Sequence, residues 1–242
     1  MNIKRLETSR LFHRFGFGPR PGEYAQALKD GVPTTRTRLT TVPVTLTTST
    51  PVALPAITDL GKRPKDKTPE SVPFALAMRN QTQQIGLWWL DMMALSDHGL
   101  TERMVWFWHG HWATSIQKLN YALPMYKQNQ LFRTHALGNF NAMTKAMLND
   151  GALQFWLDGQ DNTAKAPNEN LGRELMELFV LGVNRYSEDD VKAISRVLTG
   201  YQVEKSSGVV TINQNRRDTN PVTLLGKTGS FTGDSLTDFL VA

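Results

Sequence analysis

Apolar residues recur at helical spacing along most of the chain after residue 70. Between Ser71 and Ser96 they fall three and four positions apart and form a broad stripe, which predicts a long helix. Thr101 is a good N-cap for a second helix through TERMVWFWHGHW. Further helices are expected at about 115–135, 139–149, 168–181 and 188–199. The last one opens with Ser187 and Asp190 in a capping-box pattern.

The rest of the chain gives weaker signals. Short helical patterns cover the first 15 residues and 23–30, whereas residues 34–69 are rich in Thr and Pro and have no period. We interpret 34–69 as a long surface loop or internal linker. The only convincing strand pattern is a hairpin at 201–213, within a β appendage covering 201–225. Strands and helices do not alternate, so the predicted fold is mainly α: a multi-helix globular domain with a small β-hairpin near its C-terminus.

Composition narrows the function classes. The 242 residues suffice for one large core, and residues 1–242 are interpreted as one helical domain. Cysteine is absent, which excludes disulfides and thiolate chemistry. The net charge of +5 comes without a long basic run, so no nucleic-acid partner is predicted. No apolar stretch reaches the roughly 20 residues of a membrane span, and the N-terminus lacks the apolar region of a secretory signal. The localisation stays open.

The stretch NENLGRELMELF, Asn168 to Phe179, carries many polar groups for a helix that also has a clean leucine face. Its polar arc consists of Glu169, Asn170, Arg173, Glu174 and Glu177. Val180 and Leu181 flank this arc, which indicates burial of the last turn. Buried carboxylates must be paired or ligated, and Arg173 can compensate only one of them.

His109 and His111, in WFWHGHW, are the candidate partners of those carboxylates. On a continuous helix the two rings would diverge by about 200°, so both could face one site only if Gly110 breaks the helix. Four aromatic residues surround them, and such a setting can shift their titration. Satisfied core histidines would give the same pattern.

Several segments together resemble the bacterial family called domain of unknown function 1800. The segments are FHRFGFGPRPGE, FWHGHWATS, RTHALGNF, LDGQDN, PNENLGRELMELFVLGV, YSEDDVKAISRVLTGY and LLGKTGSFTGD. The family has no established activity to carry over. Its motifs match here at Asn168, Asn170, Arg173, Glu174, Glu177, His109, His111, Arg133 and His135. Family sequences have a His-Asp pair where this chain has Arg217 and Asp218.

The resemblance also implies a longer protein. Relatives continue well beyond this length, and GDSLTDFLVA starts a helix at Asp234 that the chain end cuts short. We therefore expect an N-terminal fragment, incomplete at its C-terminus. Many relatives look exported, whereas this chain shows no signal segment.

The leading hypothesis is an acid/base or metal-assisted site, with hydrolysis as one reaction it could run. The predicted site residues are His109, His111, His135, Arg173, Glu174 and Glu177. A divalent metal would be held by Glu174, Glu177 and His111. The first alternative is a non-catalytic scaffold or partner-binding domain, with a protein partner, in which the polar residues only tie helices together. Binding of anionic polymers through the basic excess is the third option.

Overall fold

The computed structural model describes residues 3–41 and 52–242. Its first helices are α1 (Ile3–Arg14), α2 (Glu23–Asp30), α3 (Val32–Thr40), α4 (Ser71–Leu95), α5 (Gly99–His111), α6 (Ile116–Leu119) and α7 (Ala122–His135). They are followed by α8 (Phe140–Leu148), α9 (Gly151–Trp156), the 3-10 turn η1 (Gly159–Asp161), α10 (Asn170–Glu174), the π-helix η2 (Leu175–Val180), α11 (Glu188–Val197), the 3-10 turn η3 (Gln214–Arg216) and α12 (Gly233–Val241). The strands are β1 (Tyr201–Glu204), β2 (Val209–Ile212), β3 (Val222–Leu224) and β4 (Lys227–Gly229).

The predicted fold class is confirmed, because helices dominate and the strands form only two small antiparallel pairs. In the first pair β1 and β2 align Tyr201 with Ile212, which places a hairpin where the sequence pattern predicted one. The second pair, β3 with β4, extends past residue 225 and was not expected. The capping box of Ser187 and Asp190 also forms and starts α11.

Two boundaries differ from the prediction. The loop expected from residue 34 starts only after Thr40, because Gly31 at φ +88° ends α2 and Pro33 lies in the first turn of α3. Residues 42–51 of that expected loop lie outside the described part, and residues 52–70 carry no helix or strand. The helix expected at 115–135 is split into α6 and α7, since Asn120 adopts a left-handed φ of +63°.

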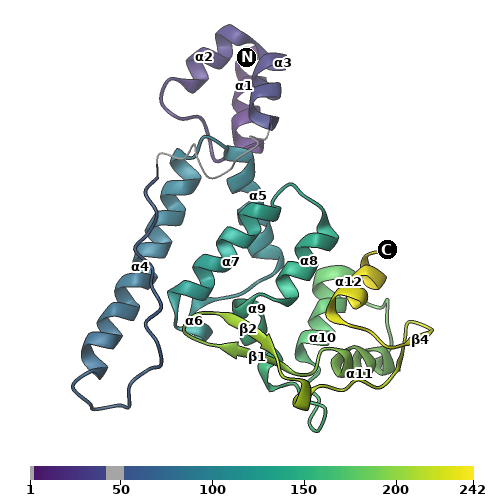
Figure 1. Ribbon diagram of the computed structural model, residues 1–242. Helices are drawn as coiled ribbons and strands as arrows, with labels where there is room; N and C mark the ends of the chain where they lie inside the picture. Colours follow the sequence, from purple (N-terminus) through teal and green to yellow (C-terminus); the bar gives the residue numbers. More distant parts are fainter. Residues whose placement is uncertain (1–2, 42–51) are drawn as a thin grey trace.

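Figure 1 shows how the helices are arranged. The long helix α4 runs along one edge, and α1 to α3 pack on one another beyond its C-terminal end. Helices α5 and α7 lie between α4 and the remaining body, and each contacts α4. The strands and helices α8 to α12 make up the far side of that body.

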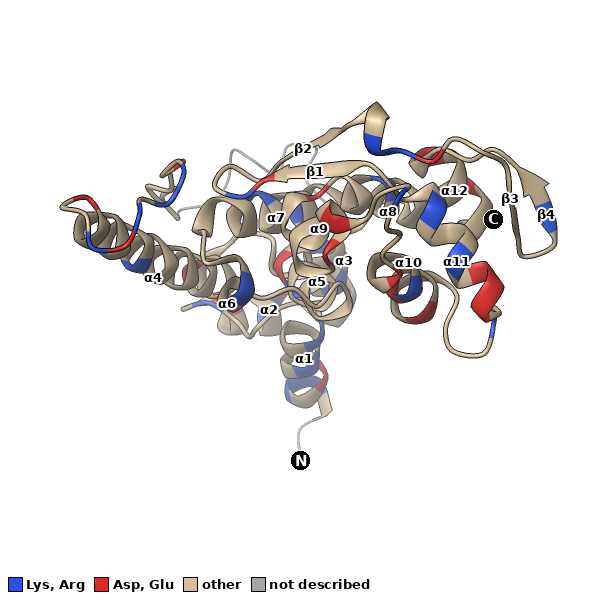
Figure 2. Ribbon diagram, turned by 90° about the horizontal axis from the view of Figure 1, so that it is seen from below, with Lys and Arg blue, Asp and Glu red and all other residues tan. Residues whose placement is uncertain are grey.

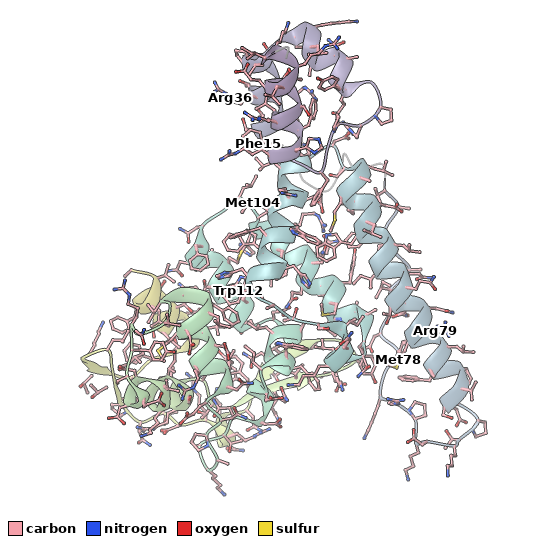
Figure 3. All side chains as sticks on the ribbon, turned by 180° about the vertical axis from the view of Figure 1, so that it is seen from behind. Phe15, Arg36, Met78, Arg79, Met104 and Trp112 are labelled. Atoms are coloured by element: carbon pink, nitrogen blue, oxygen red, sulfur yellow. The ribbon has the colours of Figure 1, made fainter. Side chains whose placement is uncertain are left out.

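The hydrophobic core lies in the body. Trp112 follows directly on α5 and is fully buried, and Figure 3 places it among the helices of the body. Phe132, Met143, Leu153 and Leu175 belong to the same core cluster. Burial of each such side chain contributes about 1.5–3 kcal/mol, so the core fixes the positions of α5 and α7 against the body. Met78 and Arg79, by contrast, lie toward the N-terminal end of α4, away from this core (Figure 3).

Two further observations concern the distribution of charged residues and the apolar character of the helices. Figure 2 shows Lys and Arg spread over several elements, with Asp and Glu interspersed, rather than gathered on one face of that view. Among the helices that the structure describes, none combines the length and the apolar character needed to cross a bilayer.

Candidate functional site

The two histidines of the WHGH segment do not share a site. Helix α5 continues through His111, so Gly110 does not break it. The His109 ring meets Trp89 at 5.0 Å and Phe132 at 6.4 Å between ring centres, on the side of α4 and α7. His111 instead packs on Phe179 of η2. The condition for a common site, a helix break at Gly110, is not met.

His111 contacts the NENLGRELMELF segment through the backbone. Its Nε2 lies 3.0 Å from the carbonyl oxygen of Phe179. A carbonyl only accepts, so Nε2 of His111 is the donor in this hydrogen bond. Phe179 lies in the last turn of η2, where carbonyls have no intrahelical partner. His111 therefore ties α5 to the end of the π-helix instead of neutralising a carboxylate.

The carboxylates of the same segment have other partners. Arg173 pairs with Glu188 of α11 at 2.8 Å and with Glu169 at 3.1 Å, and these contacts raise its pKa. Glu177 accepts a hydrogen bond from the hydroxyl of Tyr186. Partial burial, and then the neighbouring Glu177, raise the pKa of Glu174. This side of the predicted site is thus a half-exposed network between α10, η2 and α11.

The predicted divalent-metal site gains no ligand cluster. Within residues 3–41 and 52–242, no group of three or more His, Asp or Glu side chains could hold a metal ion. His135 ends α7, and its imidazole makes no hydrogen bond or ion pair with any described residue. The metal set of Glu174, Glu177 and His111 stays a prediction.

A cavity of about 240 Å³ lies between α4, α5, α7 and the segment that leads from α5 into α6, and one of the predicted residues lines it. Its lining is Thr82, Ile85, Gly86, Trp89, His109, Thr114, Ser115, Ile116, Met125 and Asn129. The aliphatic and aromatic members provide an apolar wall, and the hydroxyls, the amide and the imidazole provide a polar one. Burial lowers the pKa of His109, which makes the neutral imidazole the form present at pH 7.

A buried ion pair supports the polar wall from behind. Arg133 of α7 donates to both carboxylate oxygens of Glu102 on α5, from Nε at 2.6 Å and from Nη2 at 2.8 Å. The Arg133 and Glu102 side chains are only 8% and 1% exposed. The same Nη2 also donates to Oδ1 of Asn129 at 2.9 Å, and Asn129 lines the cavity. The charge pair thereby fixes the orientation of a lining amide.

A second buried chain of hydrogen bonds reaches the cavity at Thr114. The Thr114 hydroxyl lies 2.5 Å from Oε1 of Gln128, and Nε2 of Gln128 donates to Oδ1 of Asp150 at 2.6 Å. Asp150 also accepts from the backbone N–H of Leu153, as the N-cap of α9. Burial raises the pKa of Asp150 to about 6. A fully buried carboxylate thus sets the direction of a hydrogen bond that ends at the cavity wall.

Comparison with known proteins places the chain in a family. The sequence profile described as "Protein of unknown function (DUF1800)" matches residues 10–242. The chain belongs to the DUF1800 family. No curated protein and no solved structure matches it.

The DUF1800 segments noted in the sequence fall on two different sides of the molecule. FWHGHWATS and RTHALGNF supply His109, Thr114 and Arg133, which lie at the cavity or behind it. PNENLGRELMELF supplies the Arg173 ion pairs and the carbonyl that His111 contacts. Glu102 and Asp150 were missed by sequence reasoning. Each sits in the first turn or at the cap of a helix, where acidic residues are ordinary surface features.

Proposed function

We propose that this DUF1800 chain binds a small uncharged molecule in the cavity between α4, α5 and α7, with His109 as the proton-accepting group. The observation that carries the proposal is the convergence of two buried polar networks on one cavity. Burying charges such as Arg133, Glu102 and Asp150 costs desolvation energy that apolar residues in their place would not cost. Such arrangements concentrate at functional sites, where they hold polar groups in fixed orientations.

His109 has the chemistry that this role needs. A neutral imidazole offers one acceptor nitrogen, and its lowered pKa keeps that nitrogen free of a proton at neutral pH. Neither ring nitrogen of His109 makes a hydrogen bond to a described residue, so no described protein group competes with a ligand for them. General base catalysis of a proton transfer is the reaction class that fits such a group.

The lining also favours an uncharged ligand. None of the ten lining residues is Asp, Glu, Lys or Arg. The two charged groups nearest to the wall through hydrogen bonds, Arg133 and Asp150, are already held by Glu102 and by Gln128. A charged ligand would lose its hydration in this cavity without gaining an ion pair.

This proposal narrows the sequence-based hypothesis. Of the six predicted site residues, His109 is the one to which the proposal assigns the acid/base function. His111, Arg173 and Glu177 make contacts that join α5, η2 and α11 and are consistent with a structural role.

Ligand-observed NMR with phenol and benzoate tests the proposal. Phenol should show saturation transfer from the protein and benzoate should not. Gly86→Leu should abolish the phenol signal, because a Cβ at Gly86 meets no atom within 4 Å and a leucine side chain at this lining position can occupy the space that the ligand needs. Asn80→Leu, an exposed position on the same helix outside the cavity lining, is the matched control. Equal phenol signals in wild type and Gly86→Leu, or preferential binding of benzoate, would contradict the proposal.

A protein-binding role is the second candidate, and one observation favours it. Helix α4 buries Trp88 and Met92 on one side and leaves Leu76, Leu87 and Leu90 more than half exposed on the other. A helix that is apolar around most of its circumference usually has a partner on both sides. This role uses the outer face of α4, whereas the cavity lies on its inner face, so the two functions are compatible.

A further inference from the structure

We infer that the ligand of the His109 cavity is a planar, uncharged ring carrying both a hydrogen-bond acceptor and a hydrogen-bond donor, as in a cyclic amide. The inference rests on the proposed function and specifies its ligand class. It follows from the polarity of two lining groups, Asn129 and Thr114, which the buried networks fix.

Asn129 must present its amide nitrogen to the cavity. A guanidinium group only donates, so the Asn129 atom that contacts Arg133 Nη2 has to be the oxygen. The amide NH2 therefore points away from Arg133, and it makes no hydrogen bond with a described residue. Since Asn129 is buried and lines the cavity, a ligand in the cavity meets a donor at this position.

Thr114 must present lone pairs. Oδ1 of Asp150 accepts from the Leu153 N–H, so it acts as the acceptor for the Gln128 amide nitrogen as well. Gln128 consequently turns its oxygen toward Thr114, and the Thr114 hydroxyl has to donate its only proton to that oxygen. The Thr114 oxygen can therefore only accept a hydrogen bond from a ligand.

The shape of the cavity favours a flat ring. The Trp89 and His109 rings meet at 83° with 5.0 Å between their centres, which forms an aromatic corner in the lining. A planar ligand can stack on one ring and meet the other by its edge, the two arrangements that aromatic pairs prefer. Ile85, Ile116 and Met125 complete the apolar wall.

The volume of this solvent-open cavity is large enough for a ring system. An engineered cavity of roughly 150 Å³ in another protein binds benzene. The present cavity of about 240 Å³ is larger, so a substituted six-membered ring or a small bicyclic one fits.

Three probes of similar size test the inference: 2-pyridone, N-methyl-2-pyridone and toluene. The first offers an acceptor and a donor, the second only an acceptor, and the third neither. Titrations followed by protein NMR should give the tightest binding for 2-pyridone. Its N-methyl derivative should bind roughly tenfold more weakly, because the buried Thr114 oxygen then accepts no hydrogen bond from the ligand.

Two variants test whether Thr114 causes the difference in affinity between 2-pyridone and N-methyl-2-pyridone. Thr114→Val should make 2-pyridone and N-methyl-2-pyridone bind equally, whereas Thr114→Ser should retain the difference. Circular dichroism melts establish that both variants are folded, and the serine variant keeps the Gln128 contact. Gly86→Leu should remove binding of all three probes.

The outcomes separate the two proposals. If toluene binds as tightly as 2-pyridone and Gly86→Leu removes both, the cavity binds ligands but the donor and acceptor pattern is refuted. If Thr114→Val leaves the tenfold difference unchanged, the assignment to Thr114 is refuted. Failure of every probe to bind at millimolar concentration would overturn the proposed function itself.

Discussion

At the scale of single residues, burial shifts the pKa values of two titratable groups in opposite directions. Burial disfavours the charged form of both His109 and Asp150, so it lowers the pKa of the imidazole and raises that of the carboxyl. The hydrogen bonds from Gln128 and Leu153 favour ionised Asp150 and offset only part of its shift. At pH 7 the cavity thus has a neutral imidazole in its wall and an ionised, hydrogen-bonded carboxylate behind that wall.

The Asp150 shift predicts a pH-dependent stability. Its folded pKa of about 6 exceeds the ordinary value of 3.8, so its contribution to stability is complete below pH 4 and is lost as the pH rises through 6. The loss amounts to roughly 3 kcal/mol at 1.36 kcal/mol per pKa unit. Asp150→Asn keeps a good N-cap without the charge. Urea unfolding between pH 4 and 8 should show the stability of the wild type falling relative to that of the variant. A parallel pH dependence in both proteins would contradict the assignment.

Which site residues the sequence could reveal depends on where their partners lie. His109 and Arg133 stood out because a charged or titratable group sits among aromatic and apolar neighbours in the chain. Glu102 gave no such signal, since it lies in the first turn of a helix and its partner Arg133 is 31 positions away. No hydrogen bond or ion pair joins His109 to Glu174 among the described residues, and helical angles along one segment do not say which side of α5 faces α10.

At the scale of elements, two helical glycines differ in the space that surrounds them. Gly172 of α10 lies against α11, where an added Cβ would stand 2.8 Å from Ile194 Cγ2 and 2.9 Å from Ser195 Oγ. Gly86 of α4 has no atom within 4 Å of such a Cβ. The first glycine permits a close helix crossing, and the second leaves room beside the cavity.

Alanine at these two positions should shift stability in opposite directions. Gly86→Ala should stabilise the protein by about 0.5–1 kcal/mol, the helix-propensity difference between the two residues. Gly172→Ala should destabilise it by about 1–3 kcal/mol, because overpacking outweighs the propensity gain. Chemical denaturation measures both, and each variant is the control for the other. Stabilisation by Gly172→Ala would show that α10 and α11 can separate at no cost.

Most helices could be predicted from the sequence because their apolar spacing and caps are local properties. Ser187 with Asp190 is such a case, and its capping box forms as the pattern indicated. The division at Asn120 and the change to a π-helix at Leu175 could not be predicted. Both depend on where neighbouring elements lie, since tertiary contacts decide between backbone conformations of similar energy.

At the scale of the whole molecule, the cavity depends on how α4 stands against α5 and α7. Its lining residues range from Thr82 to Asn129 and come from separate elements, so no single segment carries a signature of it. The apolar pattern of α4 predicted the helix but gave no indication that Leu76, Leu87 and Leu90 would stay more than half exposed.

These exposed leucines lead to a prediction about association. Leu87 and Leu90 are 55% and 61% exposed, and burial of such side chains in an interface contributes about 1.5–3 kcal/mol each. If α4 binds a second protein chain, Leu87→Gln with Leu90→Gln should weaken that association. Sedimentation velocity of the purified protein tests the case in which the second chain is another copy. A monomer at all concentrations, in wild type and variant alike, would exclude self-association through α4.

The π-helix at Leu175–Val180 has a consequence for how this segment tolerates changes in length. In geometric terms a π turn is an α turn that has taken up one extra residue. Deleting exposed Leu178 would let the segment close into ordinary α-helix with little loss of backbone bonding. Because the π turn absorbs the extra residue, the deletion would leave the elements after it in nearly the same orientation, and the carbonyl of Phe179 would stay near His111. The contact between α5 and the end of the π-helix should therefore tolerate the loss of one residue from this segment.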